Sequence, residues 1–225
     1  MTANMKKILL LTLLSFAYAK IDHPADSLLE SKNTTFLQKV FIYPLTQWQR
    51  ISYKSSALNC QFYPSCSNYC SLAIKSNGPL FGSIIAIDRI TRCNSSALYY
   101  HQKIGGAYKD QDGRLIDNVK PISYIENVNP SLFGSTLAFL PGIGRFYSGR
   151  IYDGIYGMLN LLLSAKAYSI AIKTENKSMA NIWGWTSVIL YASEVYGSWR
   201  TSKYYQPKKN WWRNGVAKPP HFFTL

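Results

Sequence analysis

The feature that most constrains the fold is a set of four cysteines in one short segment, at Cys60, Cys66, Cys70 and Cys93. A pair of short helices buries too little apolar surface to be stable alone, so cross-links between cysteines would compensate. The segment therefore predicts a small helical domain with structural cysteines. Disulfides are the favoured state, with zinc held by four thiolates and free buried thiols as alternatives, and the sequence does not choose the pairing.

Helix signals flank these cysteines. A helix is predicted over 68–76, and Asn77-Gly78 followed by a proline would end it. A second helix is predicted over 80–91. We expect its isoleucines at positions 84, 85, 87 and 90 to face inward, and Arg89 and Arg92 to face outward.

The residues from Cys60 to Tyr69 read Cys-Gln-Phe-Tyr-Pro-Ser-Cys-Ser-Asn-Tyr, and Trp48-Gln49 precedes them. Further positions continue the pattern in the order Ala73, Gly78, Gly82, Arg89, Arg92 and Cys93. Together these residues resemble the YidD family, the membrane protein insertion efficiency factors. The resemblance covers residues 40–95, which we expect to form the cysteine domain. Phe62, Tyr63, Pro64 and Tyr69 would shape it.

The chain departs from the family pattern at several places, beginning with Ser52, which comes one residue early after Trp48-Gln49. Gln61 stands where the family usually has Arg, Asn94 follows the last cysteine where the family usually has Pro, and only Gly105-Gly106 echoes the family's tail. The resemblance implies a role in the insertion of newly made inner-membrane proteins, near the YidC-type insertase and the Sec translocon. The departures imply a divergent branch.

The N-terminal residues have the pattern of a secretory signal. Residues 1–19 combine a basic pair, a short apolar run and an Ala-Tyr-Ala site. We predict a signal sequence there, with an uncleaved anchor as the alternative. Residues 20–39 are expected to form a mobile segment. The stretch from Leu37 to Trp48 is amphipathic, and it would either lie at a membrane surface or cover a small core.

The C-terminal half has a different character. Residues 96–130 suggest a linker with a turn at Asp112-Gly113, and residues 131–199 are expected to form a hydrophobic helical hairpin. The Pro141–Gly149 segment resembles the signature of small two-transmembrane hairpin domains, with Arg145 at the membrane interface. Helices are predicted over 151–172, long enough to span a bilayer, and over 179–199. A soluble helical bundle is the alternative.

The charge of the chain points to anionic partners. The 225 residues include 25 Lys and Arg against 11 Asp and Glu, a net charge of +14. Residues 200–225 contain six basic and no acidic side chains, interleaved with aromatic ones. This tail suits the interface of an anionic phospholipid membrane. A solvated tail and a single-stranded nucleic-acid surface are alternatives, but no recognised nucleic-acid motif accompanies it, and nucleic acid is not an expected partner.

No enzyme motif is present. The three histidines stand apart from the cysteines, and the chain lacks a phosphate-binding loop, a nucleophile elbow and a zinc-protease motif. We therefore predict no catalytic residue, no metal and no cofactor. A thiol redox or zinc enzyme is a minor alternative, because no Cys-x-x-C pair or adjacent base supports it.

These observations predict a mainly α, membrane-associated accessory factor in the bacterial inner membrane. Its partners would be anionic lipid, the insertase or translocon, and nascent membrane proteins, with the cysteine domain outside. The alternative is a basic amphipathic protein that perturbs membranes in a lytic manner. The side chains predicted to contact lipid or a partner are Arg50, Arg89, Arg92, Arg200, Lys208 and Lys209.

Overall fold

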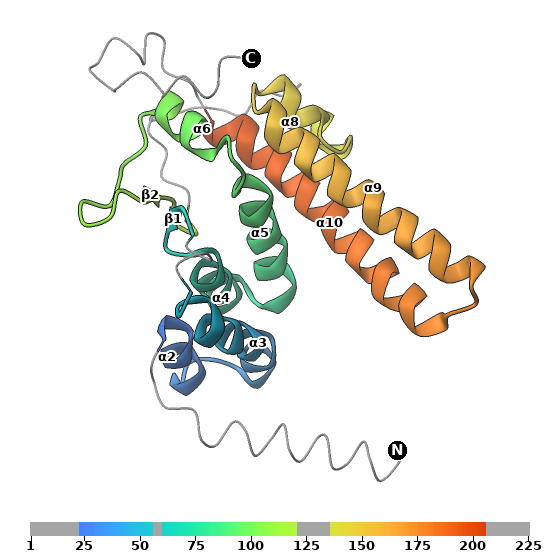
Figure 1. Ribbon diagram of the computed structural model, residues 1–225, viewed down its shortest axis with the longest axis horizontal. Helices are drawn as coiled ribbons and strands as arrows, with labels where there is room; N and C mark the ends of the chain where they lie inside the picture. The colour runs from blue at the N-terminus through green and yellow to red at the C-terminus, as the bar shows by residue number, and fades with distance from the viewer. Residues whose placement is uncertain (1–22, 56–59, 121–135, 206–225) are drawn as a thin grey trace. The chain divides into compact units, whose positions relative to one another are not determined.

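The computed structural model describes residues 23–55, 60–120 and 136–205. The chain divides into two compact units, Met1–Asn59 and Cys60–Leu225, coloured in order along the chain in Figure 1. The fold is mainly α, as predicted, and the strands of the described part are two short ones. The predicted signal sequence over 1–19, together with Lys208 and Lys209, lies outside the described residues.

The described part of the first unit is a pair of helices, α2 (Pro24–Glu30) and α3 (Phe36–Ser52). Where a mobile segment was expected, α2 forms with proline in its first turn. Thr35 caps α3 through the backbone N–H of Gln38, whose side chain accepts from the Thr35 N–H in return. The two helices are joined by the backbone N–H of Ala25, which donates to Gln49 Oε1 at 3.1 Å.

The second unit begins with the cysteine segment. A short strand, β1 (Phe62–Tyr63), leads into α4 (Cys66–Asn77) and α5 (Pro79–Arg92), so both predicted helices are confirmed to within a few residues. Gly82 lies where these helices cross. A Cβ at this position would collide with the backbone of Ala73 and Ile74, so the crossing requires glycine. The glycine and alanine of the sequence pattern thus let the two helices approach closely.

The segment predicted as a linker contains regular structure in its described part. It forms α6 (Ala97–Ile104) and β2 (Leu115–Ile116), and β2 pairs in parallel with β1. The predicted turn is present, with Gly113 at a φ of 68° and its N–H bonded to the carbonyl of Lys109 at 2.8 Å. Phe62, Ala97 and Leu115 form a small core that Cys60 and Cys93 pack against. The pairing therefore brings residues after 115 to the cysteine segment.

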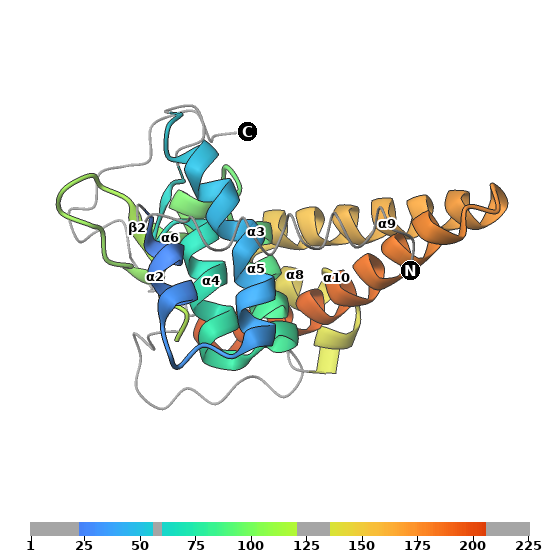
Figure 2. The ribbon, with the colours of Figure 1, turned by 90° about the horizontal axis from the view of Figure 1, so that it is seen from below.

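A helical hairpin completes the unit. After the 3-10 turn η3 (Leu137–Phe139) and the short α8 (Ile143–Tyr147), α9 (Ile151–Lys173) and α10 (Lys177–Tyr204) run side by side (Figures 1 and 2). Both views show their joining turn projecting away from the other helices of this unit. The hairpin prediction is confirmed, although α10 continues to Tyr204, five residues beyond its predicted end at 199.

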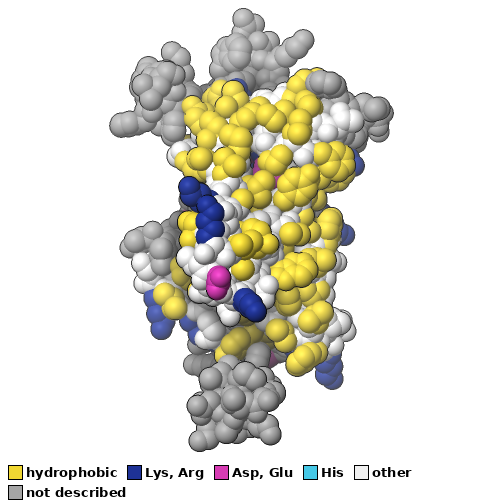
Figure 3. All heavy atoms as spheres, turned by 90° about the vertical axis from the view of Figure 1, so that its right-hand side faces the viewer, with side chains coloured by type: hydrophobic (Ala, Val, Ile, Leu, Met, Phe, Trp, Pro, Cys, Tyr) yellow, Lys and Arg dark blue, Asp and Glu magenta, His cyan; other side chains and the backbone are white. Residues whose placement is uncertain are grey.

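The outer part of the hairpin exposes apolar side chains. Among the described residues, one helix, α9, is both long enough and apolar enough to cross a membrane. Its 23 residues span about 35 Å. Leu163 on α9 is 67% exposed and Trp185 on α10 is 70% exposed. On the face that includes the joining turn, hydrophobic side chains dominate the described surface and charged ones are few (Figure 3). Water is a poor solvent for such a surface.

The predicted orientation of α5 was wrong. Arg89 is fully buried and Arg92 is 3% exposed, whereas Ile90 is 57% exposed. Arg145, expected at a membrane interface, is likewise fully buried. The error has a physical reason, because apolar periodicity assumes that charges face solvent, and it does not register carboxylates that the rest of the chain brings to the inner face of the helix.

We expect Gly82→Ala to destabilise the protein by about 1–3 kcal/mol, because its methyl group would meet helix backbone that has no room to move. Gly184→Ala on α10 is the matched control, since a Cβ there would meet only the ring of Tyr168, at 3.3 Å or more. Urea unfolding of both variants in mild detergent measures the difference. Equal stability of the two variants would contradict the close crossing of α4 and α5.

Candidate functional site: an arginine cluster around Asp117

One carboxylate binds three guanidinium groups in the second unit. Asp117 follows β2 directly, and its backbone N–H donates to the carbonyl of Tyr63 at 3.0 Å. Its Oδ2 accepts from Arg89 at 2.6 Å and from Arg92 at 2.5 Å, and its Oδ1 accepts from Arg200 at 2.9 Å. Residues from α5 and from the end of α10 are thus joined through a single side chain.

Arg89 also fixes the cysteine segment. Its guanidinium lies 3.8 Å from the ring centre of Phe62 and 4.7 Å from that of Tyr69. It donates to the carbonyl of Pro64 at 3.1 Å. Cation–π contacts and charge-assisted hydrogen bonds reinforce each other away from water. Two aromatic residues and the proline of the motif therefore line the site in which the buried Arg89 side chain lies.

A second set of ion pairs connects α5 to the hairpin. Asp88 accepts from Arg92 at 2.9 Å and from Arg145 on α8 at 2.9 Å. Arg145 also donates to Glu194 on α10 at 3.1 Å. At the start of α9, Asp153 pairs with Arg150 and accepts from Asn94, the residue that departs from the family pattern, at 2.6 Å. These contacts bind the C-terminal helices to the segment after the last cysteine.

The arginines keep both central carboxylates ionised. Burial alone would raise the pKa of Asp117, but Arg92, Arg200 and Arg89 hold it well below its usual value. Burial opposes ionisation of Asp88 in the same way, and Arg92 and Arg145 lower its pKa to about 2. Ion pairs of this kind contribute to stability only while the carboxylate is charged.

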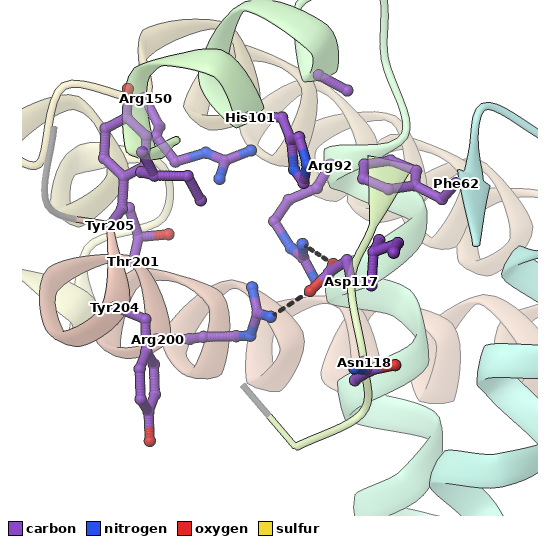
Figure 4. Close-up of a pocket in the computed structure, with 13 residues that line it drawn as sticks. Phe62, Arg92, His101, Asp117, Asn118, Arg150, Arg200, Thr201, Tyr204 and Tyr205 are labelled. Carbon is purple, nitrogen blue, oxygen red and sulfur yellow. Dashed lines mark hydrogen bonds and ion pairs between the residues drawn. The ribbon is translucent and has the colours of Figure 1, made fainter. Parts of the chain in front are cut away.

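A small pocket lies beside Asp117. Its volume is about 60 Å³, and Arg92, Arg150 and Arg200 extend toward it from different helices and turns (Figure 4). His101, Tyr204 and Tyr205 also line it. Burial lowers the pKa of His101, whose Nε2 lies 2.8 Å from the carbonyl oxygen of Ala107, so this side chain is neutral. The chemistry that the pocket offers is therefore the binding of an anion.

Three of the four cysteines come together beside this cluster. Cys60, Cys66 and Cys93 place their sulfur atoms within 4.8 Å of one another, and the Cys60 and Cys66 sulfurs are 3.3 Å apart. Hydrogen bonds from the thiols of Cys66 and Cys93 lower the pKa of Cys60. All four cysteines are free thiols in the structure, so the predicted disulfide stays a prediction. Cys70 lies outside this three-thiol group, in which a soft metal ion would find suitable ligands.

The predicted contact residues have different surroundings. Arg89, Arg92 and Arg200 belong to the buried cluster, and Arg50 pairs with Asp26 at 3.0 Å in the first unit while keeping part of its side chain exposed. Their contact with lipid or a partner stays a prediction. Sequence reasoning missed Asp117, Arg145 and Glu194 as members of the site. An acidic residue after a short β-prone Leu-Ile pair was the available signal for Asp117, and it is weak.

Fold and site define a class: helical proteins whose cysteine-containing core holds buried arginines beside an apolar hairpin. Residues 37–100 match the family YidD, described as "Putative membrane protein insertion efficiency factor". A relative with that description from Staphylococcus carnosus is 36% identical over 58 residues, covering 26% of this chain and 69% of the relative. One from Protochlamydia amoebophila is 34% identical over 58 residues, covering 26% and 71%. The chain belongs to the YidD family. No solved structure matches it.

We expect Asp117→Asn to cost about 3–5 kcal/mol of stability, because it removes the charge that three buried guanidiniums share. Asp112→Asn is the control, since Asp112 forms its ion pairs in an exposed turn and should change stability little. Denaturant unfolding in detergent gives both values.

The same carboxylate predicts a pH dependence. Its pKa is lowered in the folded state, so its stabilisation is complete above the unfolded value of about 3.9 and is lost as the pH falls toward the folded value. The wild type should lose stability below about pH 4. Asp117→Asn should lose less over that range, and parallel pH profiles would contradict this role.

Proposed function

We propose that the protein is a non-catalytic, membrane-associated accessory factor that assists the YidC/Sec machinery in inserting inner-membrane proteins. Family membership is the observation that carries the proposal, because the curated relatives are described as insertion efficiency factors. The absence of a recognised catalytic motif in the sequence agrees with an accessory role.

The hairpin supports association with the bilayer. Its outer part exposes large apolar side chains, whereas its base buries polar ones such as Ser198 and Thr201 against the rest of the unit. An element that is polar at its protein-bound end and apolar at its free end suits a lipid environment. Anionic phospholipid is the proposed surface, in keeping with the net charge of +14.

Placing a cation on the exposed apolar surface should release the protein from the membrane. Leu163→Arg combined with Trp185→Arg puts charge on both hairpin helices, at about 2.5–3.5 kcal/mol each near the centre of a bilayer. Ser178→Arg, beside Lys177 at the polar turn, is the matched control. We expect alkaline extraction to solubilise the double variant and to leave the control in the membrane.

The same variants test the role in insertion. In vesicles carrying the insertion machinery, the wild type and the control should accelerate the insertion of a newly made membrane protein, measured by its protection from protease. The double variant should behave like vesicles without the chain. Equal insertion in all samples would contradict the proposal, and dye release from plain liposomes would point to the lytic alternative.

We place the cysteine domain on the outer side of the membrane, an assignment supported by the predicted signal sequence. A membrane-impermeant maleimide should then label thiols of intact cells. Mild reduction should increase the labelling, because it opens the predicted disulfide. Cys60→Ser should remove that increase, because Cys60 lies against Cys66, whereas Cys70→Ser should preserve it. Labelling that requires cell lysis would contradict the assignment.

A further inference from the structure

The pocket beside Asp117 concentrates positive charge from three separate elements. Arg92 comes from α5, Arg150 precedes the first residue of α9, and Arg200 lies near the end of α10. Figure 4 shows these side chains extending toward a common space. Asp117 is bonded to Arg92 and Arg200 but not to Arg150. Guanidinium groups that line one pocket repel one another unless an anion lies between them.

The carboxylates around the pocket do not fully balance this charge. Arg92 pairs with Asp88, and Arg150 pairs with Asp153. Arg89, which is not among the residues that line the pocket, pairs with Asp117. Arg145 and Glu194 balance each other, and the neutral His101 adds no charge. The remaining groups are four guanidiniums, of Arg89, Arg92, Arg150 and Arg200, against three carboxylates, of Asp88, Asp117 and Asp153. One positive charge is left over.

Buried donors of the pocket residues also lack acceptors. Among the described residues, no hydrogen-bond partner exists for Nη2 of Arg92, Nε of Arg200 or the hydroxyl of Tyr205. All three side chains are more than nine-tenths buried. A buried donor that has lost water and gained no acceptor is unfavourable, so several such donors around one hollow favour a ligand with several acceptor oxygens.

The arginines are held in place before any ligand arrives. The guanidinium of Arg150 lies 4.6 Å from the ring centre of Tyr100 and 5.1 Å from that of Tyr205. Asp117 and Asp88 fix Arg92 from two sides. A cavity of about 60 Å³ admits one tetrahedral oxyanion or a few water molecules. Guanidinium groups fixed in this way suit the binding of phosphate oxygens.

We infer that this pocket binds the phosphate group of a phosphodiester. A phosphodiester carries one negative charge, which matches the single surplus positive charge of the cluster, and its free oxygens would accept from Arg92, Arg150 and Arg200. The source is a phospholipid headgroup or a soluble diester. The lipid source rests on the proposed membrane association, because the pocket lies at the base of the hairpin, at the opposite end of α9 and α10 from their exposed turn.

Thermal unfolding of the full chain in a phosphate-free non-ionic detergent tests the inference. The probes are dioctanoyl phosphatidylglycerol, glycerophosphoglycerol as the same diester without acyl chains, and dioctanoylglycerol as the lipid without phosphate. We expect the phosphatidylglycerol to raise the unfolding temperature and dioctanoylglycerol to leave it unchanged. A shift with glycerophosphoglycerol as well would mean that the phosphodiester alone suffices, and a shift with glycerophosphoglycerol alone would identify a soluble source.

Variants show whether the effect arises in the pocket. Arg150→Gln should weaken binding at least about tenfold, because a charge-assisted bond is lost. Tyr205→Phe removes only a hydroxyl that has no hydrogen-bond partner in the structure, so the variant should fold like the wild type. It should weaken binding by a smaller factor than Arg150→Gln. Arg114→Gln removes a positive charge in the exposed turn and should bind like the wild type.

The inference is overturned if neither diester shifts the unfolding temperature, or if Arg150→Gln and Tyr205→Phe bind as tightly as the wild type. Flotation of the wild type with liposomes is measured in parallel. If the chain floats with liposomes but binds no diester, the inferred phosphodiester site is contradicted and the proposed membrane association is not. A chain that binds the soluble diester but fails to float contradicts the proposed membrane association and leaves the pocket intact.

Discussion

The second unit depends on one carboxylate that neutralises three buried guanidiniums. Arg89 and Arg92 on α5 are more than 100 positions from Arg200 on α10, and Asp117 reaches all three from the end of a two-residue strand. Removing arginine from water costs several kcal/mol, on the order of the whole stability of a small domain, unless an anion and hydrogen bonds replace the water. The segment between the cysteine helices and the hairpin is therefore part of the core.

Glycines make room for these ion pairs. At Gly197 on α10, a Cβ would collide with the Arg145 guanidinium and the Asp88 carboxylate, and at Gly157 on α9 it would collide with the carboxylate of Glu194. Without side chains at these two positions, the charged groups lie directly against the helix backbones. These two glycines thus leave space for charged side chains between the helices at the hairpin base. In membrane helices, small residues usually allow close apolar packing instead.

Local signals predicted a large part of this architecture. The helices at the cysteine segment and the two hairpin helices follow from caps, prolines, glycines and apolar runs, all of which act over a few residues. The burial of Arg89, Arg92 and Arg145 was not predictable in this way, because it depends on partners distant in sequence. Asp117 escaped notice for the same reason, since an isolated acidic residue in a loop gives no sign that several arginines will surround it.

Family residues and added residues share one network. Arg89 and Arg92 lie within the matched segment 37–100, whereas Arg145, Arg150, Glu194 and Arg200 lie beyond it. Asn94, where the chain departs from the family pattern, donates to Asp153 at the start of α9. The C-terminal hairpin therefore packs against the family core through charged contacts, which require a defined geometry. Apolar contacts add to them, such as that of Tyr196 with the ring of Phe81. Arg92, which lines the pocket at the hairpin base, is the last residue of α5 and directly precedes Cys93, so the pocket and the cysteine group are joined through adjacent residues of the chain.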